Sequence, residues 1–296
     1  MITDDDFLNT LWQRRTRWST TATQMKRQLD RTRLAVLLLG SWGAIATAST
    51  TTILRSAGTP TRIVALSGAV ALAVATFLTA QYLTAESTRR WIRARAVSEG
   101  VKHRILTFRA TGDAEQSGQL LADIDGIERT AADLLPMLAP SAEAVEAPRS
   151  MHPEEYVHDR VRAQIDDYYL PAARCYSTRA TRLRRAAVGL GLAATIVAAI
   201  NTGVGVEAAG RIAPWVAVMT TLSGSLLAYL AGKRYDFLVM TYLATADRLR
   251  RRLDRWRTDG SPTDRVRWAA FVADCENTIS LENASWMAKW GERTEI

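Results

Sequence analysis

One pair of residues in this chain has the spacing of a metal site, Glu155 and His158. A Glu-x-x-His pair places two metal ligands on one helical face, as in di-iron bundles, but such centres need a second copy of the pair. Neither of the other two histidines, His103 and His152, provides that copy. We therefore interpret Glu155 and His158 as surface residues of a helix, and we expect neither a metal nor another cofactor.

The glycines and cysteines predict no other catalytic chemistry. Two Gly-x-Gly pairs, at residues 189–191 and 203–205, lie within apolar segments, whereas a phosphate-binding loop joins a strand to a helix. Cys175 and Cys275 lie in polar regions, and their spacing fits neither a zinc site nor a disulfide framework. We interpret them as packed free thiols and expect that the protein is not an enzyme.

Four stretches of 21 residues contain no Asp, Glu, Lys or Arg, although charged residues make up 23% of the chain. As helices they rise about 31 Å, close to the roughly 30 Å hydrocarbon core of a bilayer. Charge-free helices in a soluble core are usually about 10 to 14 residues long. A signal peptide is excluded for the first stretch because 33 mostly polar residues precede it. The predicted membrane spans are residues 34–54, 63–83, 186–206 and 212–232.

Small and polar residues recur within these spans, and two interpretations of them stay open. In lipid, helices associate through close packing of small residues and through interhelical hydrogen bonds, while hydroxyls also bond back to their own helix. The alternative is that some of these faces line a water-filled path. The absence of charge in the spans argues against a voltage sensor or a proton relay. The candidates for pore lining or helix packing are Asn201, Thr47, Thr51, Thr221, Gly191 and Gly224.

The basic residues of the chain, whose net charge is +8, predict its orientation. Within fifteen residues of the outer ends of the two span pairs there are 15 Lys and Arg, against three in the loops inside the pairs. The positive-inside rule then places both termini and the middle segment in the cytoplasm. Arginines at the anionic leaflet account for the basic charge, and no nucleic-acid-binding motif is present. We expect a multi-pass protein of the cell inner (plasma) membrane that contacts the lipid bilayer and binds no nucleic acid directly.

The order of features repeats along the chain. A Tyr-Leu pair at 82–83 leads to Arg89, Arg90 and Trp91, and a second Tyr-Leu pair at 229–230 leads to a basic-aromatic run at 233–235. Such self-similarity indicates a tandem repeat with both copies in one orientation. The Ala-, Pro- and Glu-rich stretch between the halves lacks periodicity, as a linker does. The predicted division is a first unit at 1–139, a linker at 140–152 and a second unit at 153–296.

Apolar residues outside the spans follow helical spacing and predict long helices that extend the membrane spans. The first span is preceded by Leu8, Leu11, Trp18, Ala22, Met25 and Leu29. The fourth span is expected to continue through Tyr235, Val239, Tyr242, Ala246, Leu249, Leu253 and Trp256. A helix from Pro153 carries Val157, Val161, Ile165, Tyr168, Ala172 and Cys175. A last helix from Ser261 carries Trp268, Phe271, Val272, Cys275, Ile279, Trp286 and Trp290.

These patterns define the expected fold class. It is an all-α integral membrane protein with four transmembrane helices arranged as two tandem hairpins. The helices extend into a cytoplasmic helical bundle, since their apolar stripes need a partner surface.

The paired spans, the long flanking helices and the tail Glu276, Glu282, Trp286 and Trp290 resemble the SLATT family of bacterial two-transmembrane effectors. The likeness extends over nearly the whole chain, as two tandem SLATT-like units. The resemblance implies a membrane effector of nucleotide-signalling or anti-phage defence systems, thought to assemble into pores. It also implies a nucleotide-sensing or nucleotide-producing partner protein, because no nucleotide-binding domain is visible in the sequence.

Two functions are compatible with this sequence. In the first, the protein is a homo-oligomeric pore that the helical bundle holds closed, with any pore shared between subunits because four spans leave little room for a channel. In the second, it is a non-conducting scaffold whose helical bundle recruits a partner protein to the membrane.

Overall fold

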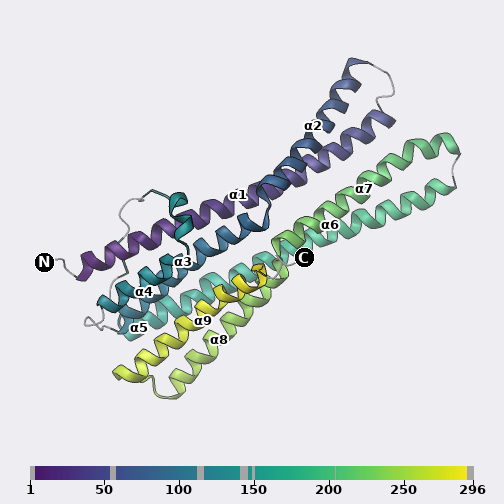
Figure 1. Ribbon diagram of the computed structural model, residues 1–296. Helices are drawn as coiled ribbons and strands as arrows, with labels where there is room; N and C mark the ends of the chain where they lie inside the picture. The colour runs from purple at the N-terminus through teal and green to yellow at the C-terminus, as the bar shows by residue number, and fades with distance from the viewer. Residues whose placement is uncertain are drawn as a thin grey trace. The chain divides into compact units, whose positions relative to one another are not determined.

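The computed structural model describes residues 4–53, 58–111, 117–140, 146–148, 151–203 and 205–291, with the backbone alone at residues 4, 206–208 and 281–291. Every regular element in these residues is a helix (Figure 1). The helices form two compact units, and each unit takes residues from both halves of the sequence. The span unit comprises Gln28–Thr84 and Cys175–Leu238. The bundle unit comprises Met1–Arg27, Ala85–Arg174 and Val239–Ile296.

The span unit contains the four helices that are long and apolar enough to cross a membrane, which confirms the four predicted spans. The first hairpin consists of the C-terminal part of α1 (Asp4–Thr52) and α2 (Thr59–Tyr82), and the second of α6 (Leu170–Thr202) and α7 (Val206–Lys233). The helices end within four residues of the predicted span boundaries at 54, 83, 206 and 232. Residue 54 itself lies outside the described residues.

Small residues allow α1 and α2 to approach closely. A Cβ added to Gly68 of α2 would lie 2.7 Å from the Cβ of Ala46, and one added to Gly43 of α1 would clash with the side chain of Leu72. Ala46 and Gly68 are both buried. Close backbone approach through small residues is the main source of helix association in lipid, where burial of apolar surface gains little.

The second hairpin is joined by a polar contact instead. The hydroxyl of Ser223 in α7 donates a 2.8 Å hydrogen bond to the carbonyl oxygen of Ala187 in α6. Gly191 lies one turn further along α6, and a Cβ placed there would meet the Ser223 oxygen at 3.5 Å.

An ion pair links the two hairpins at one end of the span unit. The Lys233 ammonium at the end of α7 lies 2.6 Å from Oδ1 of Asp30 in α1, and Arg33 approaches the same oxygen at 3.6 Å. Lys233 also lies over the Tyr229 ring, 5.6 Å from its centroid. Because the Lys233 side chain is only 14% exposed, this pair is better shielded from solvent than an ordinary surface salt bridge.

The bundle unit takes its core from both sequence halves. It contains the first part of α1, α3 (Ala85–Thr111), α4 (Ser117–Arg129), the 3₁₀ turn η2 (Ala132–Met137), α5 (Pro153–Glu155), most of α8 (Tyr235–Thr258) and α9 (Arg265–Gly291). Helix α3 packs along α9, and Trp268 Nε1 of α9 donates a buried 2.7 Å hydrogen bond to the carbonyl of Ala110. The predicted division at residues 139 and 153 concerns the sequence repeat, and it stays a prediction.

Most of the predicted apolar stripes are buried in this unit, which confirms the sequence periodicity. The buried members are Leu8, Leu11, Trp18 and Ala22 of α1, Tyr242, Ala246, Leu249 and Leu253 of α8, and Trp268, Phe271, Val272, Cys275 and Ile279 of α9. Trp286 and Trp290 belong to α9, but their side chains lie outside the described residues.

The stripe predicted from Pro153 is wrong at its C-terminal end. Tyr168 is 40% exposed and Cys175 is exposed, whereas Tyr169 and Ala173 are buried. The chain is π-helical over η3 (Tyr156–Arg162) and η4 (Gln164–Tyr169). Because a π-helix bonds residue i to i+5, each turn holds more residues than an α-helical turn, and the buried face moves forward along the sequence.

Two predicted helices differ in detail. The fourth span continues into α8 as predicted, but Arg234 adopts left-handed backbone angles (φ 48°, ψ 42°) and interrupts the helix between α7 and α8. Helix α9 begins at Arg265 and not near Ser261. The Asp264 carboxylate caps it by accepting a 3.1 Å hydrogen bond from the Arg267 N–H, a role that suits Asp at the positive end of the helix dipole.

The close approach of α1 and α2 predicts that Gly68→Ala destabilises the protein relative to Gly40→Ala. The new methyl at residue 68 meets the Ala46 methyl, whereas nothing lies within 4 Å of a Cβ at Gly40. We expect a difference of about 1–3 kcal/mol in the free energy of unfolding, the range for overpacked sites. Thermal unfolding in detergent, followed by circular dichroism, measures it. Equal stability of the two variants would contradict the close packing.

Candidate functional site

The threonines selected as pore-lining candidates in the first hairpin lie on the exposed surface of the span unit. Thr47 and Thr51 of α1 are both exposed. The Thr47 hydroxyl donates to the Gly43 carbonyl at 2.9 Å, and the Thr51 hydroxyl donates to the Ala48 carbonyl at 3.0 Å. Their protons are thus used within the helix, as the packing interpretation expects, while oxygen lone pairs stay available on the outer face.

The candidates of the second hairpin are divided between packing and exposure. Gly191 lies at the Ser223 contact, whereas Thr221 and Gly224 of α7 are exposed. Asn201, near the end of α6, has a buried Oδ1 with no hydrogen-bond partner among the described residues. The residue that bonds across the hairpin, Ser223, was not selected from the sequence.

The most strongly connected polar site lies in the bundle unit, around Glu276 of α9. This carboxylate is 1% exposed and pairs with the guanidinium of Arg160 from η3. Arg160 Nε donates to Glu276 Oε1 and Nη2 donates to Oε2, both at 2.8 Å, so the pair is bidentate. The Tyr156 hydroxyl adds a 3.1 Å hydrogen bond to Oε1. We call Tyr156, Arg160 and Glu276 the buried triad.

The electrostatics of the triad favour the ionised pair. Burial by itself raises the pKa of Glu276, but the charge and hydrogen bonds of Arg160 outweigh it and lower the pKa to about 2. Burial opposes the charged form of Arg160 too, and the attraction of Glu276 overcomes it and raises the pKa. Burial and the nearby carboxylate raise the pKa of Tyr156, so its hydroxyl remains a donor. Both ions therefore persist in the folded protein at neutral pH.

Further charges from the first half of the chain approach the triad. His103 of α3 places Nδ1 3.8 Å from Glu276 Oε2, too far for a direct hydrogen bond. Burial, and then the charge of Arg160, lower the pKa of Lys102 to about 8. Burial lowers the pKa of Arg15 in α1, which the neighbouring Glu99 partly offsets. The site thus brings charged groups of both halves together.

The sequence identified one member of the triad and missed the other two. Glu276 belongs to the selected tail, while Tyr156 and Arg160 lie in the predicted helix from Pro153 without having been singled out. The sequence feature that could have predicted this ion pair is Arg160, which directly precedes Val161 within an apolar stripe. A charge buried at such a position needs a partner of opposite charge. The side chains of Glu282, Trp286 and Trp290, the rest of the tail, lie outside the described residues.

The Glu-x-x-His pair occupies the exposed start of this region. The Glu155 carboxylate accepts a 3.1 Å hydrogen bond from the His152 N–H and so caps the helix, and His158 lies beside Asp159 at 2.5 Å. Among the described residues, no group of three or more His, Cys, Asp or Glu side chains could hold a metal ion.

Comparison with protein families identifies the second half of the chain. Residues 156–286 match the family described as SMODS and SLOG-associating 2TM effector domain 1, abbreviated SLATT_1. Residues 16–114 match a second family, described as a protein of unknown function and designated DUF4231. No curated protein and no solved structure matches the chain.

The second half of the chain therefore contains a SLATT domain of the two-transmembrane effector type, and the protein is a multi-pass membrane protein. The DUF4231 match in the first half is to a related SLATT-like unit, which is consistent with two tandem units. The matched segment of the second half begins at Tyr156 and includes Arg160 and Glu276. The buried triad is thus a feature of the SLATT segment itself.

The triad predicts that Glu276→Gln destabilises the protein strongly. The change leaves the Arg160 charge buried without its counter-ion, a loss that typically costs about 3–5 kcal/mol. The matched control is Asp274→Asn on the same helix, because Asp274 is 62% exposed and bridges only Arg252 among the ion pairs shown. We expect the control to lose under about 1 kcal/mol. Similar losses of unfolding free energy in chemical denaturation would contradict the assignment.

The same pair predicts a dependence of stability on acid. The pKa of Glu276 is lowered from 4.5 to about 2 in the folded state, so its stabilisation is complete above pH 4.5 and is lost as the pH falls toward 2. The full contribution is on the order of 3 kcal/mol. The stability difference between wild type and Glu276→Gln should accordingly be constant above pH 5 and shrink below about pH 4. A difference independent of pH down to about pH 2 would rule out the ionised pair.

Proposed function

We propose that this protein is an effector of bacterial nucleotide-signalling or anti-phage defence systems that acts as a homo-oligomeric membrane pore. It lies in the inner (plasma) membrane with both termini in the cytoplasm, has no catalytic activity of its own, and binds no nucleic acid. A nucleotide-sensing or nucleotide-producing partner supplies its signal. The SLATT match supports the effector class. The pore, the orientation and the signalling partner are the proposal.

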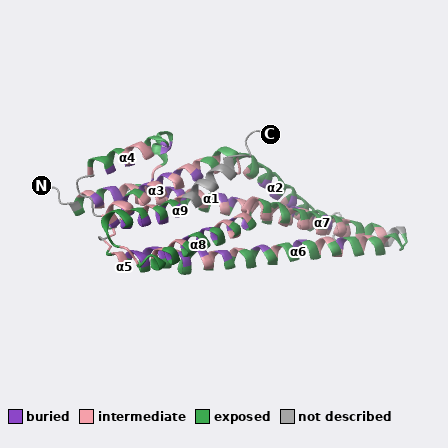
Figure 2. Cartoon of the chain, turned by 90° about the horizontal axis from the view of Figure 1, so that it is seen from below, coloured by how far each residue is buried: buried purple, intermediate pink, exposed green. Residues whose placement is uncertain are grey.

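The observation that supports a shared pore is the exposure of the spans. Only 6% to 17% of each apolar membrane segment is buried within the chain, and exposed residues run along α2, α6 and α7 in Figure 2. The exposed surface includes hydroxyls at Thr47, Thr51 and Thr221 as well as apolar side chains. Small and hydroxyl-bearing faces of this kind pack closely against neighbouring helices in lipid, so they fit contact with other subunits.

The buried triad gives the closed state a structural basis. It fixes η3 against α9, and the nearby His103 and Lys102 bring α3 to the same site. Opening of the pore then requires the helices of the bundle unit to repack without leaving Arg160 or Glu276 buried and unpaired. A signal that binds the bundle unit is therefore the natural trigger, because it acts where the alternative packings differ in free energy.

The orientation is tested by cysteine labelling in intact cells. Native Cys175 is exposed and lies before the third span, while Gly205 lies in the loop between α6 and α7. We expect a membrane-impermeant maleimide to label Gly205→Cys in intact cells and to label Cys175 only after permeabilisation. Labelling of Cys175 in intact cells would reverse the proposed topology. Introducing Gly205→Cys into a Cys175→Ser variant distinguishes labelling at residue 205 from labelling at residue 175.

Pore activity is tested by single-channel recording of the purified protein in planar bilayers, with its oligomeric mass measured in parallel. We expect discrete current steps from an oligomer, and a severalfold change in conductance in Asn201→Leu and Thr47→Val, because each removes a polar group from a candidate lining face. The control is Thr52→Val, because Thr52 is half-buried at the end of α1 and its hydroxyl bonds to the Ala48 carbonyl. Silent bilayers from a folded oligomer, with stable capture of one partner, would favour the scaffold instead.

A further inference from the structure

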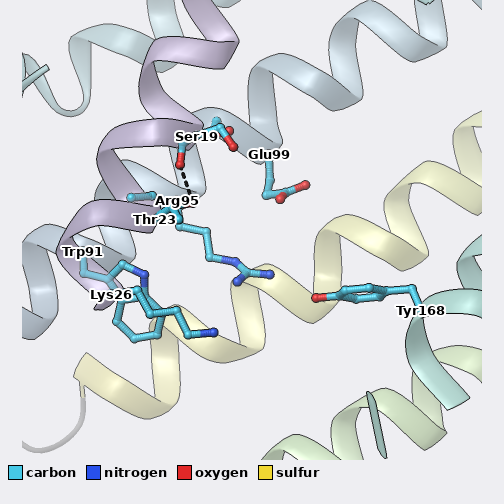
Figure 3. A pocket seen from close by; sticks show the side chains of 9 residues that line it. Ser19, Thr23, Lys26, Trp91, Arg95, Glu99 and Tyr168 are labelled. Carbon is cyan, nitrogen blue, oxygen red and sulfur yellow. Dashed lines mark hydrogen bonds between the residues drawn. The ribbon is translucent and has the colours of Figure 1, made fainter. Parts of the chain in front are cut away.

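The bundle unit contains a polar cavity that the proposed pore does not use. It lies between α1, α3 and η4 and has a volume of about 190 Å³. Figure 3 shows the side chains that line it, with Lys26 and Arg95 extending into the same space and Tyr168 pointing its hydroxyl toward the Arg95 guanidinium. Hydroxyls of Ser19, Thr23 and Ser98 complete most of the polar lining.

The size of this cavity restricts what it can bind. Its volume is several times the roughly 30 Å³ that a water molecule occupies in the liquid, and it falls below the roughly 300 Å³ at which pockets for drug-sized ligands begin. A tetrahedral anion or one small polar group fits, whereas a complete dinucleotide does not. The lining also contains few apolar groups that would favour a hydrophobic ligand.

The lining offers the donors that an oxyanion requires. Arg95 supplies a planar guanidinium that can bind two oxygens of one anion, and Lys26 supplies a compact positive charge. Lys26 lies over the ring of Trp91, 6.0 Å from its centroid, so this aromatic side chain steadies the ammonium at the cavity. The Ser19 hydroxyl of α1 can add a neutral donor, whereas the Thr23 hydroxyl donates its proton to the Ser19 carbonyl at 2.8 Å.

The one acidic residue of the lining, Glu99, does not cancel this positive charge. Three cations outside the lining, Arg15, Lys102 and Arg160, each interact electrostatically with Glu99. These cations outnumber the two carboxylates that they approach, Glu99 and Glu276. The pKa of Lys102, lowered to about 8 by burial and by its positive neighbours, is consistent with that excess. With Lys26 and Arg95 against Glu99, the charged side chains of the lining itself carry a net positive charge.

We propose that this cavity binds a compact tetrahedral oxyanion, either phosphate itself or the phosphate group of a monoester, between Lys26 of α1 and Arg95 of α3. Bound there, the anion connects α1 with α3 and with Tyr168 of η4, and so stabilises the bundle unit. The site is independent of whether the protein conducts ions. The same chemistry is available from a soluble phosphate ester or from an anionic lipid headgroup.

The test is isothermal titration of inorganic phosphate into the full-length protein in nanodiscs of zwitterionic lipid, in a phosphate-free buffer. We expect saturable binding to the wild type. We also expect a loss of affinity of at least about tenfold in Lys26→Met and in Arg95→Met, since each removes a charge-assisted hydrogen bond. The matched control is Arg90→Met, which removes the same charge from α3 at an exposed pair with Glu86, outside the cavity.

The outcomes separate the proposal from its rivals. Absence of saturable binding to the wild type, or an equal loss of affinity in Arg90→Met, would overturn it, the second result because it indicates diffuse attraction to a basic surface. All variants must keep the wild-type unfolding temperature without phosphate, and Lys26→Gln and Arg95→Gln replace any that do not. A second titration in nanodiscs containing phosphatidic acid identifies the source. Weakened phosphate binding there assigns the site to a lipid headgroup, and unchanged binding assigns it to a soluble phosphate.

Discussion

The ion pair between Arg160 and Glu276 is the constraint on which the bundle unit depends. Two charges removed from water cost several kcal/mol each unless their geometry and hydrogen bonds compensate, and here the pair is bidentate and Tyr156 adds a third donor. That requirement fixes the position of η3 relative to α9. The π-helical turns of η3 and η4 rotate Arg160 and Tyr169 onto the buried face. The rare π-helical geometry of η3 is thus stabilised by the buried ion pair between Arg160 and Glu276.

The span unit is held by a different balance of forces. In lipid the apolar surface has no water to escape, so association depends on close contacts such as Gly68 against Ala46 and on single polar bonds such as Ser223 to Ala187. These contacts are few, and most of each apolar segment remains exposed. The bundle unit is thus specified by a buried charge pair, whereas the span unit leaves most of its apolar surface exposed.

The sequence predicts the spans and the buried stripes because membrane length and helical period depend on residue type and spacing alone. It does not predict the shift from Tyr168 to Tyr169, since a π-helical turn depends on tertiary contacts that override local periodicity. The break at Arg234 has no glycine at the left-handed position itself, and Gly232 lies two residues before it. Glu276 was visible in the tail, but its partner Arg160 lies 116 residues away, and only the fold brings them together. The cavity beside Lys26 and Arg95 likewise requires three separate elements.

The most direct test of this account is a double-mutant cycle between Arg160 and Glu276. The unfolding free energies of Arg160→Met, Glu276→Gln and the double variant are compared with that of the wild type in detergent. We predict that the double variant is more stable than the sum of the two single losses implies, by about 2 kcal/mol or more, because removing both charges leaves neither one buried alone. Additive losses would show that the pair does not couple η3 to α9, and they would contradict the account.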